Sequence, residues 1–379
     1  MKLPPFKLVT RLSEWRDCLA NLRTEPRLAV DLEANSMFAY RESVCLIQIS
    51  TPTQDYIIDP TIEFDLSGLG YLIADVAVEK IFHAAEYDLI LLKRQYGWEL
   101  QNLFDTMWAA RILGYSRIGL ASLLEDIYQI QLNKRYQKSN WCKRPLTPEQ
   151  LAYAQHDTHY LFQLRDHLAQ QLLAKGCVEE AAETFIQQTH IELSDNGFDP
   201  DGFWSINGAR DLSKRQQAIL RALSVFRDQE ARRRDQPLFK VFNDRTLLAL
   251  AKQMPLHHNQ LVQVHGMTQG QIRRYGRQLL RVIGEANEAP FPKYPVHNHK
   301  RHPEAVVSRY EKLRQWRKQR ALIRGVESDV ILSRSALWEI AYNNPKNNDE
   351  LSRLESLGAW RCNTYGDEIL NVLEGRASS

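Results

Sequence analysis

The chain of 379 residues is 44% hydrophobic and 25% charged, which is ordinary for globular proteins and excludes a disordered or fibrous chain. No stretch approaches the roughly 18 uninterrupted apolar residues of a membrane span, and the chain starts without an apolar segment of signal-peptide length. The five scattered cysteines lack zinc-site spacing and indicate reduced thiols, so we expect a soluble cytoplasmic protein of two or three domains.

Charge is distributed unevenly along the chain. Residues 1–209 hold 19 Lys and Arg against 28 Asp and Glu, a net charge of −9, whereas residues 210–327 hold 25 against 10, a net charge of +15. Residues 328–379 hold 5 against 8. This asymmetry suggests a site that concentrates carboxylates, tethered to a surface that attracts a polyanion. For any single basic run, a solvated helix face is the alternative.

Short β-rich runs open the chain at residues 28–33, 44–50 and 56–59, separated by polar or Pro-containing segments. Residues 80–83 are typical of another strand, followed by an apolar-periodic helix at 84–95. A strand at 103–105 then leads into a helix at 106–113. Strands followed by α/β alternation predict an α/β domain with a mixed sheet and flanking helices.

A long helical pattern runs from Thr147 towards Ala174, with Pro148 in the first turn, where helix starts favour proline. The first domain is therefore expected to cover residues 1–193. Residues 194–202 are dense in turn-forming residues and predict a linker.

Beyond the linker, shifting the chain by 90 residues superimposes it on itself without a gap. Helical apolar periods in each copy predict two small all-α bundles of about four or five helices, at residues 208–287 and 298–375. A stiff, Pro-containing linker at 288–295 joins them. The matched pairs include Leu223 with Leu313, Arg227 with Arg317, Pro255 with Pro345, and Tyr275 with Tyr365.

Asp31 and Glu33 stand two residues apart at the end of an apolar run, so both side chains project from the same face of a strand. Two charges on one sheet face are costly unless a cation neutralises them, and their hard oxygens suit Mg²⁺ or Mn²⁺. Alone, however, Asp-x-Glu is also the pattern of a strand-end pair that faces water.

Two later motifs supply further candidates. Asp88 falls one turn into a helix that follows a strand, and Tyr153 and Asp157 share one helix face at i and i+4. Four carboxylates from these elements can hold two metal ions about 3.5 to 4 Å apart, as in-line displacement at phosphorus requires. Tyr153 is expected to position the attacking water, since a phenol of ordinary pKa near about 10 is less suited to act as a strong base.

In this order the three motifs resemble the exonuclease domain of the DEDD superfamily, in the variant that has Tyr in its third motif. The resemblance covers roughly residues 5–190 and includes CLIQI at 45–49, FDT at 104–106 and WCKRPL at 141–146. It implies an RNase H-like fold and 3′→5′ exonuclease activity that uses Asp31, Glu33, Asp88, Tyr153 and Asp157.

The repeated module resembles the HRDC domain, and the order of domains resembles the ribonuclease D family. This implies a monomer that hydrolyses RNA 3′ ends to 5′-mononucleotides with two Mg²⁺ or Mn²⁺ ions. The implied partners are tRNA precursors, with neither a membrane nor a nucleotide cofactor. The residues themselves indicate only phosphodiester hydrolysis, so a DNA 3′→5′ exonuclease and a non-catalytic RNA-binding protein are the alternatives.

Three residues near the motifs are interpreted as structural. Asp105 precedes a helix and is expected to cap its amino terminus rather than contact the metals. His83 and His156 flank motif carboxylates without an obvious third partner, so each is expected to be a hydrogen-bonded structural imidazole.

Other residues near the motifs are candidate RNA contacts. In the loop from Met37 to Tyr40 a side chain can stack on the terminal base, and ordinary loop packing is the alternative. Trp141 and Arg144 precede the third motif and can hold phosphates, although Arg144 can equally form an ion pair within the domain. Gln48 is either a buried or a substrate-facing amide.

The first repeat carries two basic clusters, Arg232–Arg234 and a group at helical spacing. A helix face of arginines repels itself unless an anion lies near, which favours phosphate binding. The equivalent part of the second copy lacks most of these charges, so we expect the first copy to grip RNA and the second to pack or shape the channel. The second cluster is Arg273, Arg274, Arg277 and Arg281.

Overall fold

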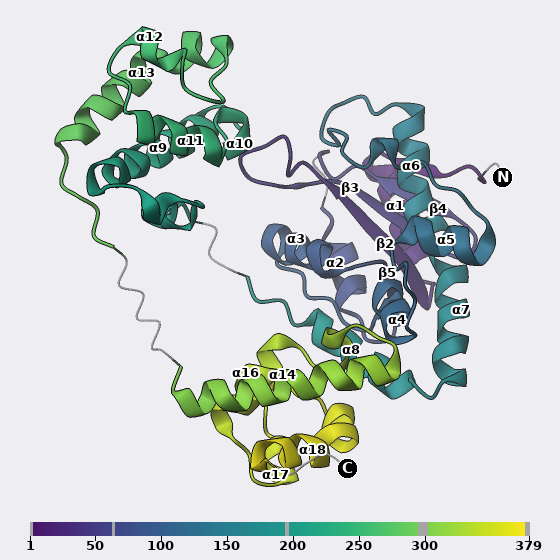
Figure 1. Ribbon diagram of the computed structural model, residues 1–379. Coiled ribbons are helices and arrows are strands. Elements are labelled where there is room, and N and C mark those ends of the chain that lie inside the picture. The colour runs from purple at the N-terminus through teal and green to yellow at the C-terminus, as the bar shows by residue number, and fades with distance from the viewer. Residues whose placement is uncertain (1–2, 63–64, 194–196, 295–301, 376–379) are drawn as a thin grey trace. The chain divides into compact units, whose positions relative to one another are not determined.

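The computed structural model describes residues 3–62, 65–193, 197–294 and 302–375 (Figure 1). Their contacts divide the chain into two compact units. The first unit comprises residues 1–34, 44–193 and 300–379, and the second comprises residues 35–43 and 194–299. The second predicted bundle therefore shares a unit with the amino-terminal domain, whereas the loop at 35–43 packs with the first bundle.

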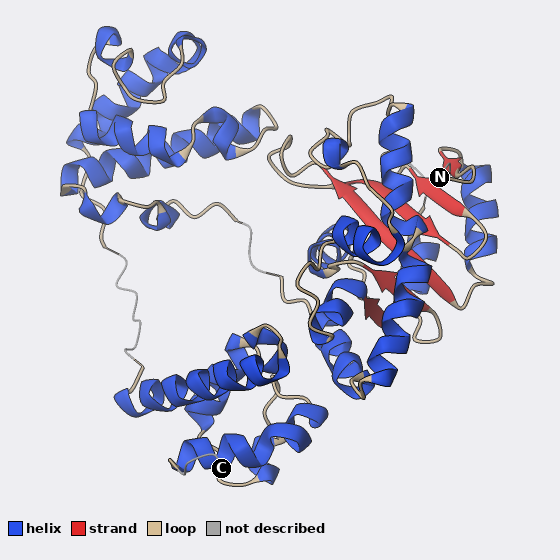
Figure 2. Ribbon diagram, turned by 45° about the vertical axis from the view of Figure 1, so that its right-hand side comes forward, coloured by secondary structure: helices blue, strands red, loops and turns tan. Residues whose placement is uncertain are grey.

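The amino-terminal domain is built on one six-stranded mixed sheet, which confirms the predicted class of fold (Figure 2). Strands β2 and β3 pair antiparallel, as do β3 and β4, whereas β1–β4, β2–β5 and β5–β6 are parallel pairs. In the order β1-β4-β3-β2-β5-β6, the strands are β1 Lys7–Val9, β4 Asp55–Ile58, β3 Val44–Ser50, β2 Arg27–Ala34, β5 Glu79–Phe82 and β6 Leu103–Asp105.

Helices cover both faces of this sheet, and β3 is buried along its whole length (Figure 2). Burial on both faces explains why β3 is an almost continuous apolar run rather than an alternating one. The helices are α1 Leu12–Leu22, α2 Ser67–Ala74, α3 Glu86–Tyr96, α4 Thr106–Ile112, α5 Leu120–Tyr128, α6 Pro148–His159, α7 Leu161–Ala174 and α8 Val178–Thr189. Of these, α3 and α4 confirm the helices predicted from periodicity.

The single long helix predicted from Thr147 to Ala174 is wrong, because the helix breaks at Tyr160. The backbone of Tyr160 has φ −91° and ψ −4°, at the margin of the helical region. The predicted start is confirmed: Thr147 caps the amide of Gln150, the Gln150 side chain caps the amide of Thr147, and Pro148 opens α6. The chain therefore forms two helices, α6 and α7, in place of the one predicted.

The two bundles repeat each other with the predicted 90-residue shift. Three pairs of helices match to the residue: α10 Leu238–Val241 with α15 Ser328–Ile331, α11 Asp244–Gln253 with α16 Arg334–Asn343, and α12 His258–Leu261 with α17 Asn348–Leu351. The longer helices also correspond, α9 Lys214–Arg233 to α14 Glu304–Arg324 and α13 Gln269–Glu288 to α18 Ala359–Glu374. Each bundle buries its own apolar core.

The second bundle docks on helix α8 within the first unit. Glu180, which is fully buried, accepts two hydrogen bonds of 2.7 Å from Arg324. Glu183 pairs with buried Arg361 at 2.7 Å and also caps α18 by accepting from the amide of Trp360. The predicted packing role of the second copy thus has a specific contact in the structure.

One cysteine pair corrects the expectation of reduced thiols. Cys45 on β3 forms a disulfide with Cys142, and their Cα atoms lie 4.9 Å apart. The two residues are 97 positions apart in the chain, so local spacing carried no signal of this pair. Cys18, Cys177 and Cys362 are free thiols.

Among the described residues, no helix is both long and apolar enough to cross a membrane. The linkers predicted at 194–202 and 288–295 lie partly outside the described residues, which exclude 194–196 and 295–301.

Candidate active site

Strand β2 places Asp31 and Glu33 on the sheet face that helix α6 covers. Asp31 lies opposite Gln48 of β3, and Glu33 lies opposite Leu46. Directly opposed residues of antiparallel strands point to the same side. Ser50, two residues beyond Gln48, hydrogen-bonds Thr158 of α6 at 2.8 Å, which identifies this side of the sheet as the one facing α6.

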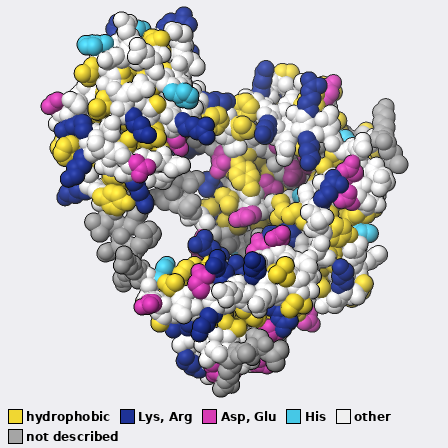
Figure 3. Space-filling model, viewed as in Figure 1, with side chains coloured by type: hydrophobic (Ala, Val, Ile, Leu, Met, Phe, Trp, Pro, Cys, Tyr) yellow, Lys and Arg dark blue, Asp and Glu magenta, His cyan; other side chains and the backbone are white. Residues whose placement is uncertain are grey.

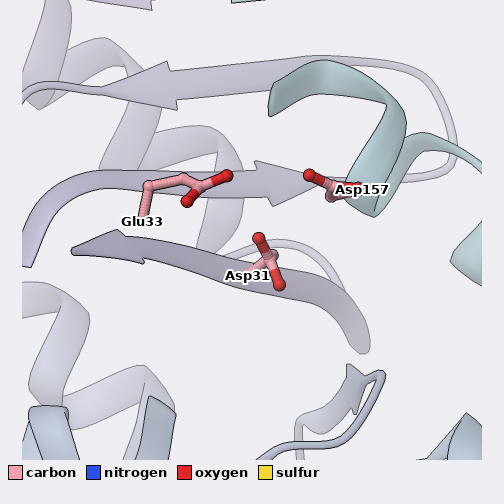
Figure 4. Close-up of side chains that lie close together, drawn as sticks. All are labelled: Asp31, Glu33 and Asp157. Atoms are coloured by element: carbon pink, nitrogen blue, oxygen red, sulfur yellow. The ribbon is translucent and has the colours of Figure 1, made fainter. Parts of the chain in front are cut away.

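Helix α6 supplies the third motif. One ligand oxygen from each of Asp31, Glu33 and Asp157 lies within 4.8 Å of the others, and Figure 4 shows the three carboxylates directed towards one another. Asp31 and Glu33 come from the strand and Asp157 from the helix. The structure therefore brings together, from two elements about 125 residues apart in sequence, three of the four predicted carboxylate ligands.

Burial makes this cluster costly in its ionised form. Burial raises the pKa of Asp31 from 3.8 to about 7, and burial together with the charges of Asp31, Asp157 and Asp88 raises the pKa of Glu33 from 4.5 to about 10. The pKa of Asp157 is also raised, first by burial and then by Asp31. Either protonation or a bound cation lowers the electrostatic cost of holding these carboxylates close together.

Asp88 lies on α3 and is buried. It is not one of the three carboxylates grouped within 4.8 Å, but its charge acts on Glu33, and burial followed by Asp31 raises the pKa of Asp88 itself. The fourth predicted carboxylate is therefore at the edge of the cluster rather than inside it.

Asp105 holds the turn that leads into α3. Its carboxylate caps α4 through the amides of Met107 and Trp108, which confirms the predicted N-cap. It also accepts from the amides of Ala84 and Ala85 at 3.0 and 2.8 Å. Ala84 has a φ of +63°, a conformation that non-glycine residues seldom adopt. Asp105 thereby fixes the chain direction three residues before Asp88, a role that sequence reasoning missed.

Tyr153 lies one turn before Asp157 on α6, and its ring packs against Trp141, with centroids 5.8 Å apart. Burial, followed by the charges of Asp157, Glu33 and Asp31, raises the pKa of the phenol far above its usual value. Tyr153 therefore keeps its proton at neutral pH. It is placed to orient a neighbouring group by hydrogen bonding and is poorly suited to act as a base.

Trp141 and Arg144, predicted as RNA contacts, are used inside the domain. Trp141 is 1% exposed. The Arg144 guanidinium forms an ion pair with Asp59 at 2.5 Å and donates to the carbonyls of Cys45 and Trp141 at 2.8 and 2.5 Å. Trp141 has no free surface for an RNA contact, whereas the Arg144 side chain is 30% exposed and forms the ion pair within the domain that was the alternative.

The two histidines near the motifs are hydrogen-bonded as expected of structural imidazoles. His83 contacts the Thr106 hydroxyl at 2.9 Å, and burial lowers the pKa of its ring to about 4. His156 contacts the carbonyl of Ala152 one turn earlier on α6.

A buried polar network beside the cluster was not expected. Asp55 of β4 accepts hydrogen bonds from Ser50 at 2.6 Å and from Gln155 at 2.6 Å, and its carboxylate contacts His159 at 2.8 Å. Gln155 and His159 stand at i and i+4 on α6, the spacing that also joins Tyr153 to Asp157. The sequence could show that Gln155 and His159 share one helix face. Their common partner Asp55 is 100 or more residues away, so no local pattern predicts it.

In the second unit the loop and the first basic cluster are largely engaged. The Tyr40 hydroxyl donates to Asp228 at 2.6 Å, and Lys240 lies 4.1 Å from the centre of the Phe38 ring, so ordinary packing describes these aromatics. Arg232 pairs with Asp228, and Arg233 and Arg234 pair with Glu230. Met37 in the same loop is exposed.

Three of the four arginines of the second basic cluster keep their free charge. Arg273, Arg274 and Arg277 are exposed on α13, and none has an acidic partner among the described residues. Arg281 lies 3.8 Å from Glu285. Figure 3 shows Lys and Arg side chains spread over the visible surface of the bundle formed by α9–α13. The first bundle thus presents an unpaired basic helix face.

Comparison with known proteins agrees with this geometry. Residues 6–173 match the family model described as 3′-5′ exonuclease, and residues 216–283 and 307–373 each match the HRDC domain. The chain therefore consists of a 3′-5′ exonuclease domain followed by two HRDC domains, which confirms the predicted class of enzyme and the predicted repeat.

Individual relatives narrow this class. Ribonuclease D of Pseudomonas paraeruginosa is 29% identical over 97% of this chain and 95% of its own. Protein RRP6-like 1 of Arabidopsis thaliana is 32% identical over 80% of this chain, which spans about half of that longer protein. The crystal structure of Escherichia coli RNase D has the same fold, with a TM-score of 0.68 at 24% identity over 99% of this chain and 100% of that one. The chain is thus similar over almost its whole length to bacterial ribonuclease D, and over about four fifths of its length to part of an RRP6-like protein.

Proposed function

We propose that this protein is a 3′→5′ exoribonuclease that releases 5′-mononucleotides from RNA 3′ ends, with tRNA precursors as its substrates. The observation that carries the proposal is the partly buried carboxylate cluster of Asp31, Glu33 and Asp157, with Asp88 at its edge. We further propose that it acts in the cytoplasm as a monomer.

The donor set fits two divalent cations, Mg²⁺ or Mn²⁺. Among the described His, Cys, Asp and Glu residues, the cluster is made of carboxylates, and hard oxygen donors favour these ions over softer metals. Two carboxylates 4.8 Å apart repel by about 3 kcal/mol at an effective dielectric constant of about 20. We propose that Asp31, Glu33, Asp88 and Asp157 hold the cations. When bound, the cations would supply a water activated for attack and stabilise charge on the leaving 3′ oxygen.

Tyr153 is proposed to orient the attacking water. Its phenol is held by Trp141 and Tyr136, with ring centroids at 5.8 and 6.5 Å, beside the Asp157 carboxylate. Because the phenol stays protonated, it can hold a water by hydrogen bonding without removing its proton. The ring contacts fix where the hydroxyl can lie, which matters because small misplacements of an orienting group cost much of the rate.

RNA is the proposed substrate on two grounds. The full-length relatives are named ribonuclease D, and the Escherichia coli protein is described as an exoribonuclease involved in structured RNA processing. In this chain, Arg273, Arg274 and Arg277 form an exposed basic face on α13, and unpaired arginines attract a phosphate backbone. We propose that this face contributes to holding the RNA, and that exposed Met37 contacts the substrate near its 3′ end.

The decisive experiment is a time course on matched RNA and DNA oligonucleotides, each labelled either at the 5′ or at the 3′ end. With Mg²⁺ or Mn²⁺ we expect 5′-labelled RNA to shorten by single nucleotides and the 3′ label to appear at once as mononucleotide. EDTA should stop both. Clear preference for DNA would replace the proposal by a DNA exonuclease, and no release with either metal would favour a binding protein without catalysis.

A further inference from the structure

Gln48 is a buried amide whose hydrogen bonds are missing. It lies in the middle of β3 with 0% exposure, and neither its side-chain nitrogen nor its oxygen has a hydrogen-bond partner among the described residues. Leaving one buried polar group unsatisfied costs about 1 to 3 kcal/mol, so both ends of an amide are seldom left unpaired. A group in this state is therefore expected to have a partner that the protein chain alone does not provide.

The strand register fixes where this amide lies. Gln48 is directly opposite Asp31, so the two side chains leave the sheet on the same face. Ser50, on the same face of β3, reaches α6 through its 2.8 Å contact with Thr158. Gln48 thus lies between β2 and α6, the elements that bring Asp31 and Asp157 together.

The neighbouring polar network does not need Gln48. One oxygen of Asp55 accepts from Ser50 and the other from Gln155, at 2.6 Å each, and His159 contacts the second oxygen at 2.8 Å. The Gln155 amide also donates to the carbonyl of Pro4 at 2.8 Å. Because the acceptors of this network are already used, the unpaired amide of Gln48 is left to face the carboxylate of Asp31, directly opposite on β2.

We propose that Gln48 is a positioning residue for the metal site, whose amide nitrogen donates a hydrogen bond to the Asp31 carboxylate when a cation occupies the cluster. A carboxylate that binds a cation through one oxygen keeps acceptor capacity on the other. Groups that hydrogen-bond metal ligands fix their orientation and raise metal affinity. The inference rests on the proposed function, because it requires the carboxylate cluster to bind cations.

The test replaces the amide without changing the length of the side chain. In the full chain, Gln48→Met should melt in EDTA at the same temperature as the wild type or higher, because an unpaired polar group is removed. Its Mn²⁺ affinity, measured by titration calorimetry without RNA, should fall by about 10- to 100-fold. Gln48→Leu is a second apolar variant if Met does not fit the site.

Gln155→Met is the matched control, since it removes a buried amide that does have partners. It should lower the melting temperature and leave Mn²⁺ affinity unchanged. In an Asp31→Asn background, adding Gln48→Met should cause no further loss of Mn²⁺ affinity, because the proposed acceptor is already altered.

Two results would separate failure of this inference from failure of the proposed function. If the wild type binds Mn²⁺ and Gln48→Met and Gln48→Leu bind it equally well, Gln48 has no positioning role and the proposed function stands. If the wild type itself binds no Mn²⁺, the two-metal proposal fails together with the inference. A loss of affinity in Gln48→Met that persists undiminished in the Asp31→Asn background would overturn the assignment of Asp31 as the acceptor.

Discussion

Asp31, Glu33 and Asp157 impose an electrostatic cost on the fold that packing alone does not remove. One carboxylate oxygen of each residue lies within 4.8 Å of the others, and the pKa of each carboxyl is raised. Repulsion among these carboxylates destabilises the folded chain when no cation is bound. The same repulsion favours the binding of a divalent cation. Two consequences can be measured.

The first concerns pH in the absence of metal. Between about pH 4 and 7 the folded chain should bind more protons than the unfolded chain, because the pKa of Asp31 rises from 3.8 to about 7 and that of Glu33 from 4.5 to about 10. The contribution of these groups to the free energy of unfolding therefore decreases as pH rises through this window. Urea denaturation in EDTA across the window measures it.

The control for this pH dependence is the Asp31→Asn, Glu33→Gln double variant. It should show a flatter pH profile of unfolding free energy than the wild type, since neither replacement titrates. Identical profiles for the two proteins would mean that these carboxylates do not carry the raised pKa values.

The second concerns Asp157→Asn, which removes the charge of a proposed metal ligand and keeps the shape of the side chain. Hydrolysis of RNA should fall well over a hundredfold, because even groups that only support metal ligands cost about 10- to 100-fold when lost. RNA affinity measured by filter binding in EDTA should stay near that of the wild type. Glu149→Gln, an exposed acid in the first turn of the same helix, should leave both unchanged; equal loss in both variants would point to damage to α6 itself.

Among the secondary-structure elements, α8 joins the exonuclease domain to the second HRDC domain. Glu180 of α8 forms an ion pair with Arg324 of α14, and Glu183 of α8 forms one with Arg361 of α18. In addition, Arg111 of α4 forms an ion pair with Asp329 at 2.5 Å. Two of these ion pairs place the acid in the first domain, and the third places it in the second copy. A duplicated module has thus become part of the scaffold of the exonuclease domain.

Glu180→Ala tests that interface. Removing the fully buried carboxylate leaves Arg324 without its main partner, and breaking a buried pair in this way costs about 3 kcal/mol. Guanidinium denaturation of the full chain should show this loss. Glu125→Ala is the matched control, because its partner Arg117 is half exposed and such surface pairs contribute about 1 kcal/mol or less. Equal effects in the two variants would contradict a stabilising role of the α8 interface.

At the scale of the whole molecule, the uneven distribution of charge assigns hydrolysis and RNA binding to different segments of the chain. Net charge is −9 over residues 1–209 and +15 over residues 210–327. Three carboxylates of the first segment meet in one partly buried cluster, whereas part of the basic excess stays free on α13. We therefore expect catalytic rate and RNA affinity to be changed by different sets of substitutions.

The triple variant Arg273→Gln, Arg274→Gln, Arg277→Gln tests this division. RNA binding should weaken, and its dependence on salt, plotted on logarithmic axes, should lose up to about 2 units of slope, because each single-strand phosphate contact contributes about 0.7. The single-turnover rate at saturating RNA should not change. Three exposed cations of the second bundle, Lys318, Lys346 and Arg353, provide the control; an equal loss of salt dependence there would show general charge attraction rather than a site on α13.

The sequence by itself predicted most strands of the sheet and the residue types of the candidate active site, but not the break between α6 and α7. Alternation placed Asp31 and Glu33 on one face of β2, and i,i+4 spacing placed Tyr153 and Asp157 on one face of α6. The 90-residue shift predicted the duplicated bundles, whose shorter helices repeat to the residue. These inferences succeeded because helix and strand periodicity depend on neighbours in the chain.

The tertiary structure alone decided which of these residues meet and which charges stay free. The Cys45–Cys142 disulfide, the pairing of Glu180 with Arg324, and the placement of Gln48 opposite Asp31 all join positions whose separation carries no local signal. The same holds for Arg144, whose guanidinium forms an ion pair with Asp59, 85 residues earlier in the chain. Burial and electrostatic pairing depend on distances between elements, and those distances exist only once the sheet and its helices have packed.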